Sequence, residues 1–173
     1  MLFRSSLFNG DMLISARSPD GTTFILLTDA TGHGLPAAVG AFPVRDVFYT
    51  MAAKGCGAVE IIEELNRKLV DILPTEFFLC GAMLVIPPNE EAVYIWNGGM
   101  TNILQYRASE KAIVLTVKSS SLPLGIANDM LFKAELVKAE VDDNDSIFLY
   151  SDGLTEAVRE DGSLCGDERL LDA

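Results

Sequence analysis

The chain has 173 residues, 25 of them acidic and 13 basic, for a formal net charge of −12; this balance argues against nucleic acid as a partner, because phosphate backbones are bound largely through Lys and Arg. An apolar share of 49% with 22% charged residues excludes intrinsic disorder and indicates one domain over residues 1–173. The sequence lacks both an apolar run of about 18 residues and a signal peptide, so we expect a cytoplasmic protein that does not contact membranes.

The N-terminal half predicts a hairpin followed by two helices. Residues 12–18 and 23–29 are short apolar runs joined by a Pro-Asp-Gly-Thr turn over 19–22, which favours a β-hairpin. Apolar residues then recur at three- and four-residue spacing over 35–53 and 58–73, which is typical of amphipathic helices. We expect Pro43 to interrupt or bend the first helix.

The C-terminal half predicts strands. After Pro74, strand patterns cover 77–86, 92–96, 102–106, 113–117, 132–139 and 146–151, with turns at 97–99 and 108–111. Short turns between consecutive strands favour antiparallel pairing. A helix pair between a hairpin and a run of strands indicates an α+β layered fold in which helices cover the sheets.

Three aspartates lie at strand ends next to small residues. Asp11 follows Gly10, Asp29 ends the second apolar run, and Asp152 follows the run 148–151. Asp-Gly at a strand end is common turn chemistry, so each aspartate alone is weak evidence. Together they predict a site for a hard divalent cation, provided that the strands of Asp29 and Asp152 are neighbours.

The chain resembles the bacterial PPM-type (protein phosphatase 2C-like) serine/threonine phosphatases of the sporulation stage II protein E and sigma-B regulator group. The motifs that carry this resemblance follow one another in the order found in the group. They are Gly10-Asp11, residues 29–38 (Asp-Ala-Thr-Gly-His-Gly-Leu-Pro-Ala-Ala), Trp96-Asn97-Gly98-Gly99, Leu122-Pro123-Leu124-Gly125, residues 151–157 (Ser-Asp-Gly-Leu-Thr-Glu-Ala) and residues 166–170 (Gly-Asp-Glu-Arg-Leu).

The resemblance implies an α/β/β/α sandwich of two mainly antiparallel sheets, with two Mn²⁺ or Mg²⁺ ions between their upper ends. By motif position, Asp29 would bridge the ions, the Ala30 carbonyl would be a further ligand, Asp11 would serve one ion and Asp152 the other. Asp11, Asp29 and Asp152 would then be the catalytic residues. Two such cations can activate water and neutralise the charge on a transferring phosphoryl group, so no protein nucleophile is required.

The group's partners suggest a role in bacterial signalling. The resemblance implies hydrolysis of phosphoserine or phosphothreonine on a regulatory protein, such as an anti-sigma-factor antagonist. It also implies an N-terminal receiver or sensor domain in a longer protein, of which this chain would be a fragment that serves as an output domain. Cys56, Cys80 and Cys165 lack Cys-x-x-Cys spacing and are interpreted as reduced core residues.

Three positions depart from the group's pattern. His33 lies four residues after Asp29, where the group often has Lys, and either opens the first helix or contacts phosphate. Met100 replaces the histidine of the group's Asn-Ala-Gly-His turn. The last Asp-Asp-x-Thr stretch and its strand are absent, and Asp172 lacks the context to replace that ligand.

The missing strand and ligand have two expected consequences. Activity should be weak or strongly dependent on metal concentration, and an exposed sheet edge would favour a homodimer. The alternative to an enzyme is a pseudophosphatase, a binding module that captures a regulator without hydrolysis. A third interpretation is an unrelated acidic α+β domain with chance motif matches.

Overall fold

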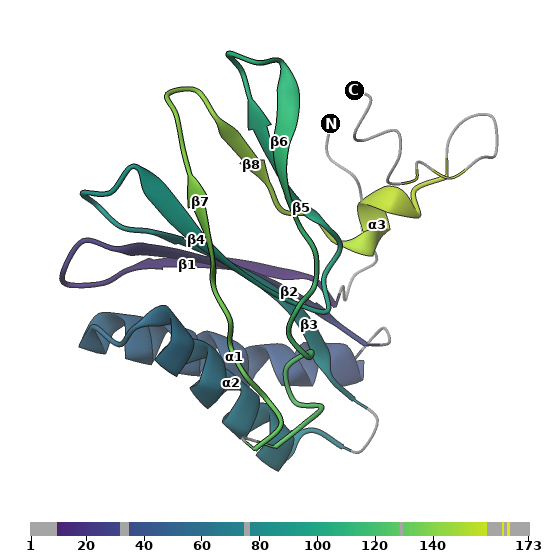
Figure 1. Cartoon of the computed structure of the whole chain (residues 1–173). Coiled ribbons are helices and arrows are strands. Elements are labelled where there is room, and N and C mark those ends of the chain that lie inside the picture. Colours follow the sequence, from purple (N-terminus) through teal and green to yellow (C-terminus); the bar gives the residue numbers. More distant parts are fainter. Residues whose placement is uncertain are drawn as a thin grey trace.

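The computed structural model describes residues 10–31, 35–74, 77–128, 130–158, 164 and 166, with side chains of the first helix from residue 42 onward. Two antiparallel sheets and a layer of two helices make up this part of the chain (Figure 1). The α+β fold predicted from the sequence is therefore confirmed. None of the helices in the described ranges is long and apolar enough to cross a membrane.

The larger sheet has five strands in the order β1-β2-β3-β4-β7, and every neighbouring pair is antiparallel. The strand bounds are β1 Met12–Arg17, β2 Thr23–Ala30, β3 Leu79–Ile86, β4 Ala92–Gly98 and β7 Val137–Glu140. The predicted hairpin is confirmed as β1 and β2, paired from Met12 opposite Thr28 to Arg17 opposite Thr23. Gly21 closes its turn at a φ of 94°, in the left-handed region that favours glycine.

The smaller sheet has three strands in the order β6-β5-β8. Its strands are β5 Ile103–Arg107, β6 Ala112–Val117 and β8 Ser146–Phe148, again with antiparallel pairing. It lies against the face of the larger sheet that is opposite the helices (Figure 1). Apolar side chains of both sheets, including Leu84, Ile95, Ile103 and Val117, fill the space between them.

Helices α1 (Leu35–Lys54) and α2 (Ala58–Ile72) cover the other face of the larger sheet (Figure 1). The buried face of α2 carries Ile61, Ile62, Leu65 and Leu69, at the helical spacing seen in the sequence. These side chains pack with Phe24, Leu26, Phe48 and Trp96 in a second core.

The sequence predicts that Pro43 interrupts or bends the first helix. An interruption is wrong, because α1 continues through that residue as one helix. A proline removes one backbone hydrogen bond of a helix. Val44, Phe48 and Ala52 are fully buried in the turns that follow. Their burial against the sheet offsets that local loss.

Two predicted strands are shorter in the structure than in the pattern. The strand expected over 132–139 begins only at Val137 and pairs with β4 as far as Ile95. Beyond that point the Asn97 carbonyl accepts hydrogen bonds from the Ser120 and Ser121 amides, so this edge of β4 is already occupied. The strand expected over 146–151 ends at Phe148, and one helical turn, α3 (Asp152–Thr155), follows shortly afterwards.

Candidate metal centre

Asp29 lies one residue before the end of β2, the second strand of the larger sheet. Its neighbour in the β2–β3 register is Cys80. Opposite residues of an antiparallel pair project from the same face, so the carboxyl and the thiol share the face that looks toward the smaller sheet. Asp29 is half-buried there.

Asp11 reaches the same region because the residue before it has no side chain. A Cβ on Gly10 would lie 3.0 Å from the Ala30 carbonyl oxygen and 3.2 Å from Asp29 Oδ1. The Ala30 amide donates to the Gly10 carbonyl over 3.3 Å. Gly10 therefore lets the start of β1 approach the end of β2, with Asp11, Asp29 and Ala30 close together.

Asp152 comes from the other sheet, directly after the segment that extends β8. The Thr101 hydroxyl donates to the Tyr150 carbonyl over 2.5 Å and fixes this segment. Asp152 is exposed, and its own carbonyl accepts from the Glu156 amide over 2.7 Å. The strand of Asp29 and the strand that leads to Asp152 thus lie in the two facing sheets and do not pair within one sheet.

A hydrogen bond joins Asp11 to Ser151, the residue that precedes Asp152. Ser151 Oγ donates to Asp11 Oδ2 over 3.0 Å. The bond connects the segment after β8 in the smaller sheet to the start of β1 in the larger sheet. The ends of the two sheets are therefore held together beside Asp29.

The pKa of Asp29 is raised because Asp11 and Asp152 lie close to it. Burial, then the charges of Asp11 and Asp152, and hydrogen bonding with both carboxyls raise the pKa of Asp29 from 3.8 to about 7. Every one of these contributions disfavours the charged form of Asp29. A bound cation would reverse the two charge effects.

The donor set fits a hard divalent cation in its chemistry. Carboxylate and carbonyl oxygens are the ligands that Mg²⁺ and Mn²⁺ prefer, and Asp11, Asp29, Asp152 and the Ala30 carbonyl supply only such atoms. In the part of the chain that the structure describes, however, no group of three or more His, Cys, Asp or Glu side chains is arranged closely enough to coordinate a metal ion. The carboxyl groups are neighbours that would still have to close around an ion.

Sequence reasoning missed two residues beside the aspartates, Ser151 and Cys80. Ser151 directly precedes Asp152 in its motif, so a search for partners of Asp11 among motif hydroxyls would have found it. Burial and the charges of Asp29 and Asp152 raise the pKa of Cys80 to about 11. Its position opposite Asp29 follows from the β2–β3 register, which the pattern alone did not fix.

The expected turn at 97–99 begins later than predicted, since β4 continues to Gly98. The Asn97 side chain is buried and organises the turn by donating to the Thr101 and Val117 carbonyls and accepting from the Met100 amide. Met100 is buried between the sheets. Two other residues considered from the sequence, His33 and Asp172, lie outside the described residues.

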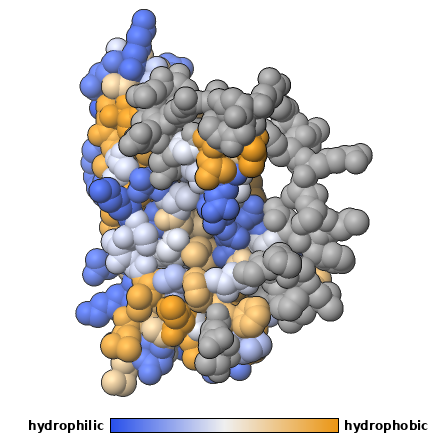
Figure 2. Space-filling model, turned by 90° about the vertical axis from the view of Figure 1, so that its right-hand side faces the viewer, coloured by the Kyte–Doolittle hydropathy of each residue, from blue (hydrophilic) through white to orange (hydrophobic). Residues whose placement is uncertain are grey.

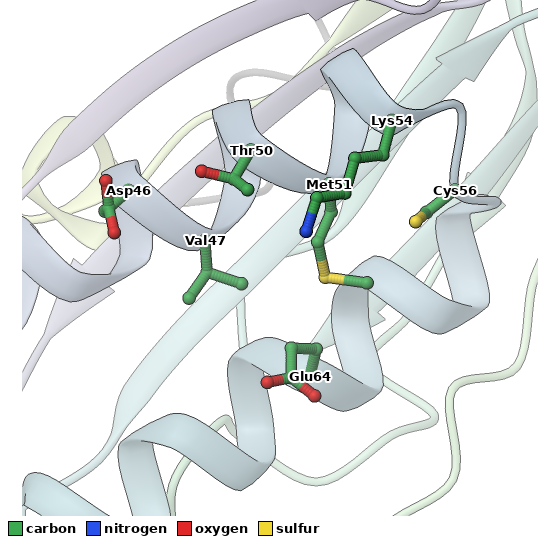
Figure 3. A pocket seen from close by; sticks show the side chains of 7 residues that line it. All are labelled: Asp46, Val47, Thr50, Met51, Lys54, Cys56 and Glu64. Atoms are coloured by element: carbon green, nitrogen blue, oxygen red, sulfur yellow. The ribbon is translucent and has the colours of Figure 1, made fainter.

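A shallow cavity of about 290 Å³ lies on the helix layer, away from the carboxyl groups. Figure 3 shows it between α1 and α2, with the Met51 side chain pointing across toward α2. Its lining mixes charged, polar and apolar groups: Asp46, Val47, Thr50, Met51, Lys54, Cys56 and Glu64. It contains none of Asp11, Asp29 and Asp152, so it is separate from the candidate centre.

Comparison with known proteins points to one family. The family model for stage II sporulation protein E (SpoIIE) matches residues 19–173. No curated protein matches the chain significantly.

Solved structures share the fold. The RsbU and RsbW domains of a Mycobacterium tuberculosis protein are 19% identical with a TM-score of 0.74, covering 89% of this chain and 42% of that one. The SiaA PP2C domain of Pseudomonas aeruginosa is 17% identical with a TM-score of 0.77, covering 95% and 65%. RsbX, solved in complex with magnesium, is 15% identical with a TM-score of 0.66, covering 84% and 67%. The chain thus spans less than two thirds of the first two structures.

Proposed function

The chain belongs to the stage II sporulation protein E (SpoIIE) family, and we propose that it is a metal-dependent protein phosphatase acting on phosphoserine or phosphothreonine. The observation that carries this proposal is that Gly10 brings Asp11 close to Asp29, while Asp11 and Asp152 both raise the pKa of Asp29 and so disfavour its charged form. Carboxylates this close repel one another, and a bound divalent cation would offset that repulsion.

Asp11, Asp29, Asp152 and the Ala30 carbonyl would hold the metal. A divalent cation bound by these residues would activate water and neutralise charge on a transferring phosphoryl group. The protein's own residues set the geometry: Gly10 permits the close approach of Asp11 to Asp29, and Ser151 orients the Asp11 carboxyl.

A protein nucleophile is not needed for this reaction, and the nearest thiol does not suit one. A Cys80 pKa of about 11 keeps the side chain protonated at neutral pH. The thiolate, not the thiol, is the reactive form of cysteine. Direct attack by water on phosphorus, with Asp11, Asp29 and Asp152 as catalytic residues, is therefore the favoured reaction.

We propose a regulatory phosphoprotein of the bacterial cytoplasm as the substrate, of the anti-sigma-factor antagonist type. Support comes from the similar fold of the RsbU and RsbW domains. An N-terminal receiver or sensor domain in the full protein, and pairing with a second copy, belong to the same proposal. The native ion would be Mn²⁺ or Mg²⁺.

Hydrolysis by the wild-type chain and by Asp29→Asn tests the proposal. Each is incubated with Mn²⁺ and p-nitrophenyl phosphate, and then with a serine-phosphorylated antagonist protein. We expect Asp29→Asn to lower kcat/KM at least about 100-fold on both substrates. Removal of a residue that only orients a metal ligand already lowers metal affinity or activity about 10–100-fold. Asp46→Asn, an exposed acid on α1, is the matched control. Equal rates for Asp29→Asn and Asp46→Asn would refute the proposal.

A pseudophosphatase is the second candidate, and it is favoured by Met100, which replaces the histidine of the group's Asn-Ala-Gly-His turn and is buried between the sheets. In this case the wild-type chain would bind the phosphorylated antagonist and release no phosphate at any Mn²⁺ concentration. Binding measured by fluorescence anisotropy, beside phosphate release on the same samples, separates the two candidates.

A further inference from the structure

The segment between β6 and β7 exposes a group of large apolar side chains. Leu122 is 44% exposed, Ile126 51%, Met130 86% and Leu131 71%. We call these four residues the apolar loop surface. Figure 2 shows apolar side chains gathered at the lower end of the face it presents, where the β6–β7 segment and the end of α2 lie in Figure 1. Exposed apolar patches of this kind mark interaction sites.

The backbone that carries these side chains is fixed by buried contacts. Asn66 of α2 is fully buried, and its side chain donates to the Ala127 carbonyl over 2.9 Å and accepts from the Gly125 amide over 3.0 Å. Gly125 has a φ of 85°, and a Cβ there would lie 3.0 Å from Leu73. The loop is therefore clamped onto α2 while neighbouring apolar side chains point into solvent.

The same segment is continuous with the candidate metal centre. Leu124 and Leu79 exchange two backbone hydrogen bonds, of 2.8 and 2.9 Å, and the residue after Leu79 is Cys80, the register partner of Asp29. On the other side, Pro123 packs against Gly99, where a Cβ would also lie 3.0 Å from Cys80 Sγ. A protein that places a phosphorylated side chain at Asp29 and extends past Cys80 and Pro123 would reach the β6–β7 segment.

Charge favours this approach over others. The protein has a net charge of −12, yet residues 119–132 include a single charged residue, Asp129. A phosphorylated protein brings further negative charge, which most of an acidic surface repels. A segment with one acidic residue in fourteen repels such a partner less than the rest of the acidic surface does.

We propose that the apolar loop surface is the docking site for a folded phosphoprotein substrate, which it contacts through apolar side chains beside the phosphorylated residue. This inference rests on the proposed function and adds where the substrate protein binds. A phosphate ester that is too small to reach from Asp29 to the loop would not contact the apolar loop surface.

The double variant Ile126→Ser/Leu131→Ser tests this, with Phe42→Ser as matched control because Phe42 of α1 is 73% exposed. Both are assayed with Mn²⁺ on p-nitrophenyl phosphate and on a serine-phosphorylated antagonist protein. We expect the double variant to lose about tenfold or more in kcat/KM on the phosphoprotein, mainly through KM, because exposed apolar contacts become buried on docking. Its rate on p-nitrophenyl phosphate should equal that of wild type.

Binding supplies a readout that does not depend on turnover. The Kd of the labelled phosphoprotein is measured for Asp29→Asn alone and for Asp29→Asn combined with the loop variant, and we expect about a tenfold weaker Kd for the latter. An unchanged Kd and unchanged phosphoprotein kcat/KM would overturn the docking site, as would equal losses on both substrates. A wild-type chain that hydrolyses neither substrate would overturn the proposed function, while the two Kd values would still decide the docking site.

Discussion

Ser151 Oγ donates a hydrogen bond of 3.0 Å to Asp11 Oδ2, although 140 positions separate the two residues in the sequence. The bond links the segment after β8 to the start of β1, and so helps to fix the Asp11 carboxyl group near Asp29. Asp152 follows Ser151 directly, and its carboxyl group also acts on Asp29. Ser151 therefore bonds to one proposed ligand and directly precedes another in the chain.

Ser151→Ala should weaken Mn²⁺ binding about 10–100-fold, the usual cost of losing a partner that orients a metal ligand. The Asp11 carboxyl would lose one of the hydrogen bonds that orient it. Isothermal titration with Mn²⁺ measures the Kd, and Ser146→Ala, at an exposed position of β8, serves as the control. The same Kd for both variants would show that Ser151 does not orient Asp11.

Asn66→Ala should lower the free energy of unfolding by about 2–4 kcal/mol, because it leaves the Gly125 amide and the Ala127 carbonyl without their partner and opens a cavity. Both groups bond to Asn66 in the structure. Urea denaturation followed by circular dichroism measures the loss. Lys68→Ala, at an exposed position of the same helix, should change stability by less than about 0.5 kcal/mol, and equal effects would contradict the assigned role of Asn66.

The lowered pKa of Asp145 should make the stability of the fold depend on pH. Its side chain is 2% exposed and accepts from Arg107 and Gln105 and from the Asp142 amide. Hydrogen bonds from Arg107 lead in lowering the pKa of Asp145 from 3.8 to about 2. A pKa lower in the folded than in the unfolded chain stabilises the fold above about pH 4, and this contribution is lost as the pH falls toward 2.

Asp145→Asn should therefore be less stable than wild type at pH 7, and the difference should narrow between about pH 4 and pH 2. Denaturation in guanidinium chloride at a series of pH values gives the two curves. The exposed neighbour Asp143→Asn is the control. A constant difference over this pH range would argue against the Arg107–Asp145 pair as its source.

Gly98→Ala should destabilise the fold by at least about 2 kcal/mol, since overpacking a filled core costs this order of energy. The new methyl group would lie 2.3 Å from Trp96 Cζ2 and 2.8 Å from the Leu122 carbonyl oxygen, and Trp96 is fully buried. Gly57→Ala meets only the flexible end of Glu60 at 3.5 Å. Thermal unfolding of both variants checks this, and similar melting temperatures would contradict the steric argument.

Much of the secondary structure could be predicted from local pattern. The β1–β2 hairpin and the buried face of α2 follow from periodicity and turn residues, which act over a few positions. The end of β4 and the start of β7 could not be predicted this way, because the amides of Ser120 and Ser121 occupy the Asn97 carbonyl. Such competition for a strand edge arises only when distant segments meet.

By itself, the sequence determined where the candidate ligands lie along the chain: three aspartates, each next to glycine or alanine, in an order that resembles one phosphatase group. Only the tertiary structure decided how they meet, since Asp29 and Asp152 come from facing sheets and Gly10 brings Asp11 beside Ala30. The physical reason is that motif spacing describes one strand at a time. The raised pKa of Asp29 and the Ser151–Asp11 bond depend on how the two sheets pack.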